Sequence, residues 1–230
     1  MKSVLFGACA AIVIAAAPAH AQSDKPVHFI IGGGMTTPNG PVADRFNTGG
    51  AFTIGLTFEK TSPFGLQVEY GFSKMNGPER RIPLMINPLV TPTGTALIQS
   101  NHRIHYVTAN GMLHGDGRHR FNPYGVAGGG IYHRSVNLTT PDVGFTTYCD
   151  PFWYICYPEP VEVNRVIGDR SSWDPGVNAG GGVAIRLGRA AAFFIEARWH
   201  FVWGPTFTDL NGDEQRANGR YFPVEFGFKF

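Results

Sequence analysis

Three sets of side chains in this 230-residue sequence are of types that could carry chemistry. The first set is Glu196, Arg198 and Glu225, which could form a buried ion pair or a gating device. If the segments holding them pair as antiparallel strands about the loop near Asn211, Arg198 comes close to Glu225. An unpaired charge inside a protein is costly, so such a pair is more often structural.

Glu69 and Arg186 are predicted to extend this network. Glu69 falls on the less apolar side of its strand, between Gln67 and Gly71. The five residues would then form a salt-bridged plug, which is favoured over a conducting pore.

The second set is a pair of histidines, His105 and His133. We expect both on the inward parity of neighbouring strands, where they could bind a metal or sense protons. The third set is Cys149 and Cys156. In an exported protein this pair is expected to form a disulfide across a short loop, stabilising it by about 2.5 kcal/mol on the chain-entropy model.

The elements that must position these residues are strands. The last ten residues, YFPVEFGFKF, alternate large apolar side chains with small or polar ones. Because successive strand side chains point to opposite faces, one face carries Phe222, Val224, Phe226, Phe228 and Phe230. A chain end is usually polar and frayed, so this face must be covered by a protein core or by lipid.

The same alternation, with falling clarity, predicts eight strands and no helix. Their expected ranges are 27–34, 52–59, 64–73, 103–113, 123–134, 177–187, 193–203 and 221–230. The connections alternate between short and long, the long ones being 35–50, 75–102, 135–174 and 204–220. This alternation is typical of an all-β, eight-stranded antiparallel up-and-down transmembrane β-barrel, with short periplasmic turns and four long extracellular loops.

The N-terminus resembles a secretory signal peptide: a basic start, the apolar run VLFGACAAIVIAAA, and Ala19-His20-Ala21. Cleavage after Ala21 would leave residues 22–230 as one barrel domain. Charged residues make up only 16% of the sequence, against about 25% in ordinary soluble domains. The formal net charge of +2 makes nucleic acid an unexpected partner.

The burial direction follows from side-chain size. The lumen of an eight-stranded barrel holds only its own side chains, and the Gly, Ser, Thr and Gln of the less apolar parity fit there. A soluble barrel would need many charged residues on its outer face, and these strands offer few. We therefore expect the Phe-rich parity to face lipid, with Tyr and Trp at the membrane interfaces.

Three segments resemble the opacity-type family of outer-membrane barrels, small eight-stranded proteins of the OmpA and OmpX kind. They are RFNPYGVAGGGIY, WDPGVNAGGGVAIRLGRAAAFFIEARWHF and PVEFGFKF. The resemblance implies a location in the outer membrane of a Gram-negative cell, within lipid and lipopolysaccharide. It also implies that periplasmic chaperones and the barrel-assembly machinery handle the chain, and that its terminal Phe222, Val224, Phe226, Phe228 and Phe230 act as the insertion signal.

These features predict a non-enzymatic, monomeric barrel without a cofactor, serving envelope integrity, surface interaction or narrow porin-like passage. One alternative is a soluble periplasmic ligand-binding barrel. The other is a lipid A-modifying enzyme, because His200 in ARWHFVW resembles the histidine of outer-membrane lipid A deacylases. Those enzymes need a serine two positions later, where this chain has Val202.

Overall fold

The computed structural model describes residues 27–59, 63–83, 95–115, 120–150, 152, 154–188, 191–208 and 212–230. The predicted signal peptide, 1–21, lies outside these residues.

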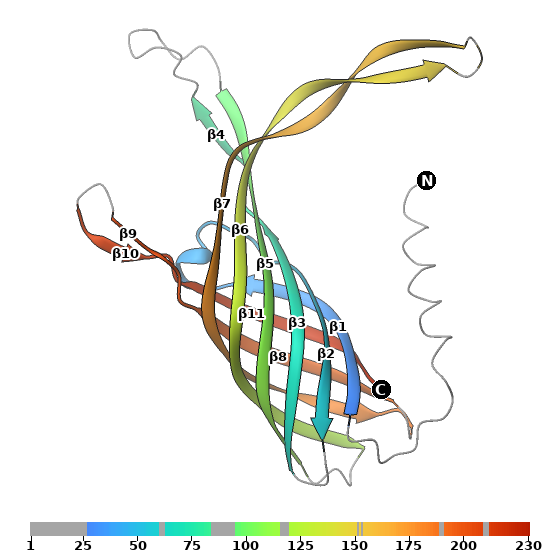
Figure 1. Ribbon diagram of the computed structural model, residues 1–230, viewed down its shortest axis with the longest axis vertical. Coiled ribbons are helices and arrows are strands. Elements are labelled where there is room, and N and C mark those ends of the chain that lie inside the picture. Colours follow the sequence, from blue (N-terminus) through green and yellow to red (C-terminus); the bar gives the residue numbers. More distant parts are fainter. Residues whose placement is uncertain are drawn as a thin grey trace.

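Eight long strands form one closed antiparallel sheet (Figure 1). In chain order they are β1 (Val27–Pro38), β2 (Gly49–Glu59), β3 (Phe64–Asn76), β5 (Thr95–His114), β6 (Phe121–Asp150), β7 (Ile155–Arg186), β8 (Ala192–Val202) and β11 (Gly219–Lys229). Each strand pairs with the next along the chain, and β1 pairs with β11 to complete the ring. The predicted eight-stranded up-and-down barrel is confirmed, and ring closure leaves no free edge in the wall.

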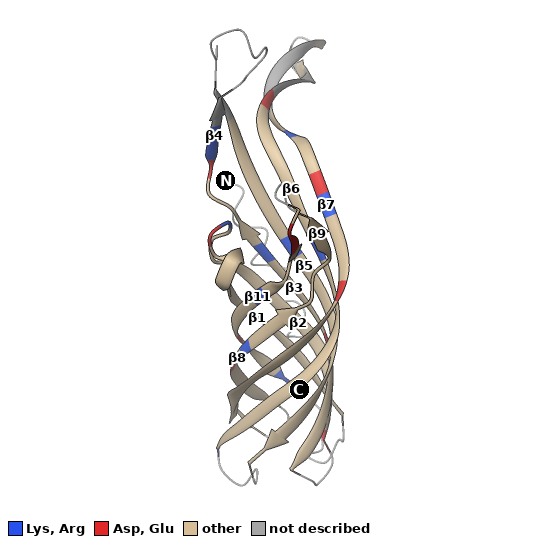
Figure 2. Ribbon diagram, turned by 90° about the vertical axis from the view of Figure 1, so that its left-hand side faces the viewer, with Lys and Arg blue, Asp and Glu red and all other residues tan. Residues whose placement is uncertain are grey.

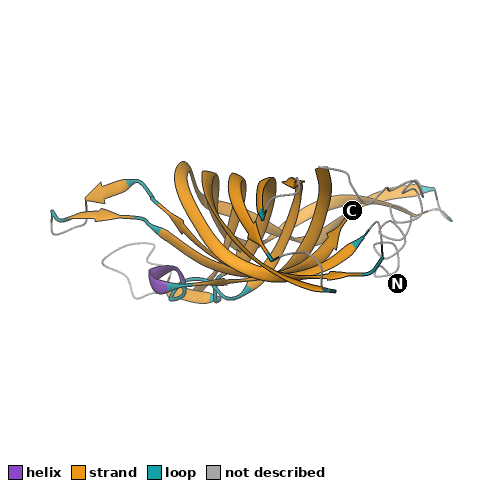
Figure 3. Cartoon of the chain, turned by 90° about the horizontal axis from the view of Figure 1, so that it is seen from below, coloured by secondary structure: helices purple, strands orange, loops and turns teal. Residues whose placement is uncertain are grey.

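Smaller elements lie at the upper end of the barrel in Figure 1. Strand β4 (Arg80–Pro83) pairs with the extension of β5, and β9 (Thr206–Thr208) pairs with β10 (Glu214–Arg216) as a short hairpin. A 3-10 turn, η1 (Gly40–Val42), is drawn as the helical segment of the described residues in Figure 3. No helix of the described residues is long and apolar enough to cross a membrane.

The third long connection differs from the prediction. Residues 135–174 were expected to form a loop, but β6 and β7 stay paired as far as Asp150 and Ile155, with one irregularity at Leu138/Thr139. The two strands leave the barrel as a β-ribbon that projects above it (Figure 1). Pro141 and Pro160 fit within the ribbon because, in the described part of the chain, the outer edge of each strand there pairs with no further strand, and such an edge tolerates the missing N–H of proline.

The two faces of the wall differ as the alternation predicted. The outward side chains of β11, from Phe222 to Phe230, are between 39% and 58% exposed, whereas Glu225 between them is 5% exposed. The outer face of β3 repeats the pattern with Phe64, Leu66, Val68 and Tyr70. Charged positions are sparse on the barrel wall and more frequent above it (Figure 2). The large apolar groups therefore radiate outward along these strands.

Glycines make room for aromatic rings inside the lumen. Gly71 on β3 lies opposite Tyr106 on β5, and a Cβ added to Gly71 would lie 2.0 Å from the Tyr106 ring. Gly176 on β7 likewise lies under the Tyr132 ring, 2.6 Å from where its Cβ would be. The two rings stack with centroids 5.3 Å apart. The tyrosines fill the tube because the facing positions have no side chain.

Candidate functional site

The centre of the lumen is occupied by one arginine and two carboxylates. Arg198, from β8, donates through Nε to Glu196 Oε1 and through Nη1 to Glu69 Oε1 on β3. Its Nη2 donates to Gln67 Oε1 at 3.2 Å. All three charged side chains are at most 6% exposed. Arg198 thus links strands on two sides of the tube and supplies the positive charge for two buried carboxylates.

Neutral side chains extend this centre across the barrel. Glu69 Oε1 also accepts a hydrogen bond from Thr108 Oγ1 at 3.0 Å, and Thr108 Oγ1 accepts one from Asn110 Nδ2 at 3.1 Å. Asn178 Nδ2 on β7 donates to Asn110 Oδ1 at 2.8 Å. Sequence reasoning missed Thr108, Asn110 and Asn178. Their polar types on the inward parity of strands that are apolar outside were the available signal.

Two predicted members of the network, Glu225 and Arg186, do not pair as expected. Glu225 points into the lumen but stands opposite Glu196 in the β8–β11 register, and among the described residues it forms no ion pair with Arg198. Arg198 instead reaches across the narrow tube to Glu69. Arg186 is exposed at the end of β7, where β8 begins, outside this network. Glu225 therefore lies in the same lumen, but Arg198 forms its ion pairs with Glu69 and Glu196 instead of the predicted pair with Glu225. The predicted role of Arg186 in the network is wrong.

The two histidines are adjacent but face outward. His105 and His133 are cross-strand partners with ring centroids 6.2 Å apart. His105 packs on Phe72 at 4.8 Å, and its Nδ1 is 2.8 Å from the Tyr70 hydroxyl, while His133 packs on Trp173 at 4.6 Å. The inward parity of β5 belongs to Ile104 and Tyr106, so the predicted lumen position is wrong. No cluster of metal ligands occurs among the described residues.

The upper end of the lumen is closed by the segment that follows η1. Phe46 packs with Met75, Ile104, Val202 and Tyr221 in a buried apolar cluster. Arg134 braces the same end: its Nη2 lies 2.6 Å from Asp174 Oδ2, and its Nη1 donates to the Ala217 carbonyl at 2.9 Å. Side chains from the wall and from two connections thus close this mouth.

The lower end is narrow as well. Glu59 pairs with Lys229 and lies 3.3 Å from His114 Nε2. The cavity beside them has a volume of about 40 Å³ and is lined by residues that include Thr57, Tyr124 and Glu196. A space of this size holds a water molecule or two, not an organic ligand.

His200 has no access to the outside of the barrel. It points into the lumen, is 2% exposed, and its Nδ1 lies 2.9 Å from the Tyr132 hydroxyl. Val202, in the place where a deacylase would need serine, is fully buried in the upper cluster. A lipid substrate outside the wall could not reach either side chain.

Among the described residues, the ribbon formed by β6 and β7 is the longest element outside the wall. A disulfide joins Cys149 to Cys156, which are cross-strand partners near its tip. Aromatic side chains cap it: Phe152 is 75% and Tyr154 is 91% exposed. Tyr154 has a φ of +56°, the left-handed conformation of a tight turn. Beyond Thr139 the ribbon strands pair only with each other among the described residues.

Strand order, closure and an apolar outer face define the class of this protein: an eight-stranded antiparallel β-barrel with the construction of outer-membrane barrels. No protein-family model and no curated protein matches the chain.

Several solved structures are similar to this chain at low sequence identity. Neisserial surface protein A is 9% identical with a TM-score of 0.48, covering 89% of this chain and 96% of that chain. A major outer membrane protein from Thermus thermophilus is 11% identical with a TM-score of 0.49, covering 92% and 99%. The outer membrane protein OprG from Pseudomonas aeruginosa is 14% identical with a TM-score of 0.41, covering 91% and 99%.

Proposed function

We propose that this protein is a non-enzymatic outer-membrane barrel with a closed lumen, whose β6–β7 ribbon is a surface-interaction element outside the cell. The barrel anchors the ribbon and contributes to the envelope. The observation that carries the proposal is a band of exposed apolar side chains on the outer face of the barrel wall, such as Phe64, Leu66 and Val68 on β3. We call it the apolar band.

The band has the height of a bilayer core. On β3 the outward residues from Phe64 to Phe72 are aromatic or aliphatic over nine residues, and their partners on β5 run from Leu113 to His105. A transmembrane β-strand needs about 9–11 residues. In water so many exposed apolar side chains would drive aggregation, so their exposure favours lipid over a soluble ligand-binding barrel.

The filled lumen supports an anchoring role over transport. Arg198 and its partners occupy the middle, and the Phe46 cluster occupies the upper mouth. Moving an ion past these groups would require breaking buried, charge-assisted hydrogen bonds. The same enclosure of His200 supports a non-enzymatic role over lipid A modification.

The ribbon supports the surface-interaction role. Its exposed aromatic residues, Phe152 and Tyr154, lie at the end farthest from the wall, held by the Cys149–Cys156 disulfide. Exposed aromatic residues are enriched in recognition surfaces. This placement favours contact with a partner outside the cell over a purely structural part.

Membrane fractionation followed by gel electrophoresis tests the barrel. We expect the protein in the outer-membrane fraction, and a band that migrates differently in unheated and boiled samples, because a detergent-resistant cylinder unfolds only on boiling. Extraction into buffer without detergent would overturn the proposal in favour of the soluble barrel. Changed lipid A acylation on overexpression would overturn it in favour of the enzyme.

A further inference from the structure

Two cations stand directly opposite each other on the outer face of the wall. Lys74 on β3 and Arg103 on β5 are cross-strand partners, and both are exposed. Like charges in this position destabilise a sheet. The adjoining outward positions hold Gly50, His105 and Ser135, and the ion pairs of the described residues include neither cation. The two cations therefore have no described anion to offset their mutual repulsion.

The position of the pair relative to the apolar band is specific. Phe72 and His105, the last residues of the band on their strands, are cross-strand partners. Lys74 and Arg103 are each the next outward residue toward the upper mouth. If the band spans the bilayer core, the two cations lie at the level of the lipid headgroups of the outer leaflet.

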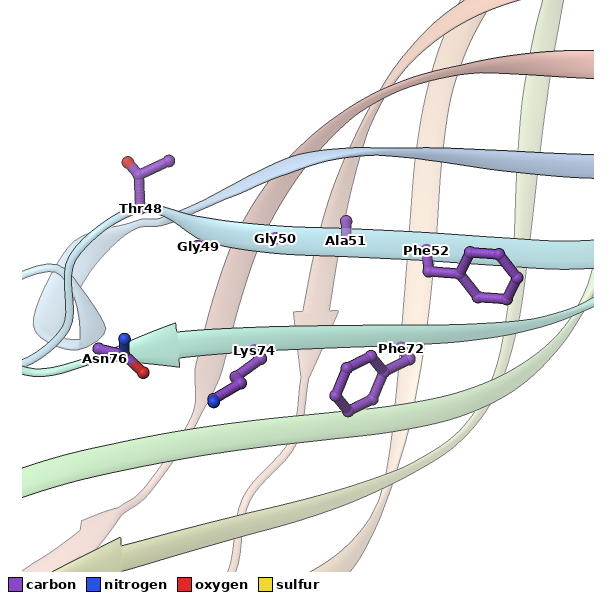
Figure 4. A pocket seen from close by; sticks show the side chains of 8 residues that line it. All are labelled: Thr48, Gly49, Gly50, Ala51, Phe52, Phe72, Lys74 and Asn76. Carbon is purple, nitrogen blue, oxygen red and sulfur yellow. The ribbon is translucent and has the colours of Figure 1, made fainter. Parts of the chain in front are cut away.

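A groove opens beside Lys74. It has a volume of about 380 Å³, and its lining includes Gly50, Phe52, Phe72 and Lys74 (Figure 4). Gly50 is the reason for the gap, because a Cβ there would have no heavy atom within 4 Å. Figure 4 shows Lys74 pointing from β3 toward β5, away from Gly50. The groove is apolar at the end formed by Phe52 and Phe72 and polar at the end formed by Thr48 and Asn76, and Lys74 lies between the two ends.

We propose that Lys74 and Arg103 bind the phosphate of an anionic lipid of the outer leaflet, and that the groove beside them receives the apolar part of the same molecule. The phosphate offsets the repulsion between the two cations through charge-assisted hydrogen bonds. Phe52 and Phe72 pack against the apolar part. This inference rests on the proposed membrane location.

The test uses the full-length protein purified in a non-ionic detergent and titrated with diphosphoryl lipid A, with bound lipid counted by native mass spectrometry. Lys74→Gln with Arg103→Gln should weaken binding roughly 30-fold, since each cation near an anionic lipid surface adds about a five-fold factor. The matched control is Arg80→Gln with Arg81→Gln on β4, which removes the same charge above the band. It should bind as the wild type does.

Two further probes identify the ligand. Dephosphorylated lipid A should bind the wild type as weakly as the Lys74/Arg103 variant binds the phosphorylated form. Inorganic phosphate at millimolar concentration should not displace the lipid. Equal binding by both variants, unchanged binding of the dephosphorylated lipid, or displacement by inorganic phosphate would each overturn the inference.

Failure of the membrane location gives a different result. A wild-type protein that dissolves without detergent and shows no heat-dependent migration contradicts the proposed function itself. A lipid-site variant that still shifts on boiling has an intact barrel, so its loss of lipid reports on the site alone.

Discussion

At the scale of single residues, Arg198 is the side chain whose loss should cost most. Arg198→Met would leave Glu69 and Glu196 buried without their cation, and breaking a buried pair in this way costs about 3 to 5 kcal/mol. Unfolding by urea in detergent micelles measures the change in free energy of unfolding.

Two controls separate charge from packing. Arg165→Met removes an exposed partner of Asp142 at 3.6 Å and should change stability by less than about 1 kcal/mol. Adding Glu69→Gln and Glu196→Gln to Arg198→Met should recover part of the loss, because a neutral amide is cheaper to bury than an unpaired carboxylate. No recovery would mean that packing of the arginine stem is the larger effect.

Gly71 tests whether the small positions of the wall are what allow the lumen to be filled. Gly71→Val would drive two methyl groups into the Tyr106 ring and should lower the free energy of unfolding by about 1 to 3 kcal/mol. Gly111→Val is the matched control, because its Cβ would meet only the Ala127 carbonyl at 3.8 Å on the outer face. The same urea titration compares them, and equal losses would contradict the filled lumen.

Residue parity was predictable only where one face of a strand is apolar. On β11 the phenylalanines alternate with Glu225 and Gly227, so the phenylalanine face is clearly the apolar one. On β5 both parities are apolar near the mouth, with Ile104 and Tyr106 inside and Val107 outside, because the upper lumen is itself an apolar cluster. The inward or outward position of His105 could not be settled from such a strand, nor could that of its cross-strand partner His133 on β6.

Which charged residues pair was harder to predict than strand parity, because the pairing depends on whether a side chain is long enough to cross the lumen. Neighbouring strands suggest Arg198 with Glu225, but a long arginine in a narrow barrel can contact the opposite side, where Glu69 lies. The alternation of side chains along a strand gives no information on which residues face each other across the lumen.

At the scale of elements, the ribbon should be separable from the barrel. Replacing residues 140–165 with an Asn-Gly turn removes strand segments that, in the described part of the chain, pair only with each other. We expect the shortened protein to keep its heat-dependent migration, and we expect cells that express it to lose the surface attachment shown by cells that express the full-length protein. Attachment that survives the deletion would place the interaction outside the ribbon.

The disulfide should affect the tip alone. Cys149→Ser with Cys156→Ser removes a cross-link worth roughly 2.5 kcal/mol to the ribbon and nothing to the wall, since the ring it closes is short and outside the barrel. Protease added to intact cells should cut the variant near residue 150 faster than the wild type. A lowered barrel unfolding transition in the same variant would contradict this separation.

The ribbon also marks the limit of element prediction. The eight wall strands follow from alternation, but residues 135–174 contain Pro141, Pro158 and Pro160, which argue against a central strand. Among the described residues the outer edges of both ribbon strands pair with no further strand, and proline is tolerated at such edges. Only the three-dimensional pairing shows that these edges are open.

At the scale of the whole molecule, the closed wall and the filled lumen together predict a barrel that does not conduct ions. The ring between β1 and β11 leaves no gap in the wall, and the lumen is blocked at its middle and upper mouth. Protein reconstituted into planar bilayers should therefore leave conductance at the level of protein-free bilayers. Stable conductance steps would require the Arg198 network or the Phe46 cluster to open.

The orientation of the apolar face gives the sharpest test of the membrane location. Phe226 is 58% exposed in the middle of β11, so Phe226→Arg would place a charge in hydrocarbon and cost about 2 to 4 kcal/mol of folding free energy in lipid vesicles. Phe207→Arg on β9 is the matched control: Phe207 is 47% exposed but lies in the hairpin above the wall, where water solvates the arginine. A soluble barrel would tolerate both substitutions, because both side chains would already face water. Equal stability of the two variants would therefore remove the reason for placing this barrel in a membrane.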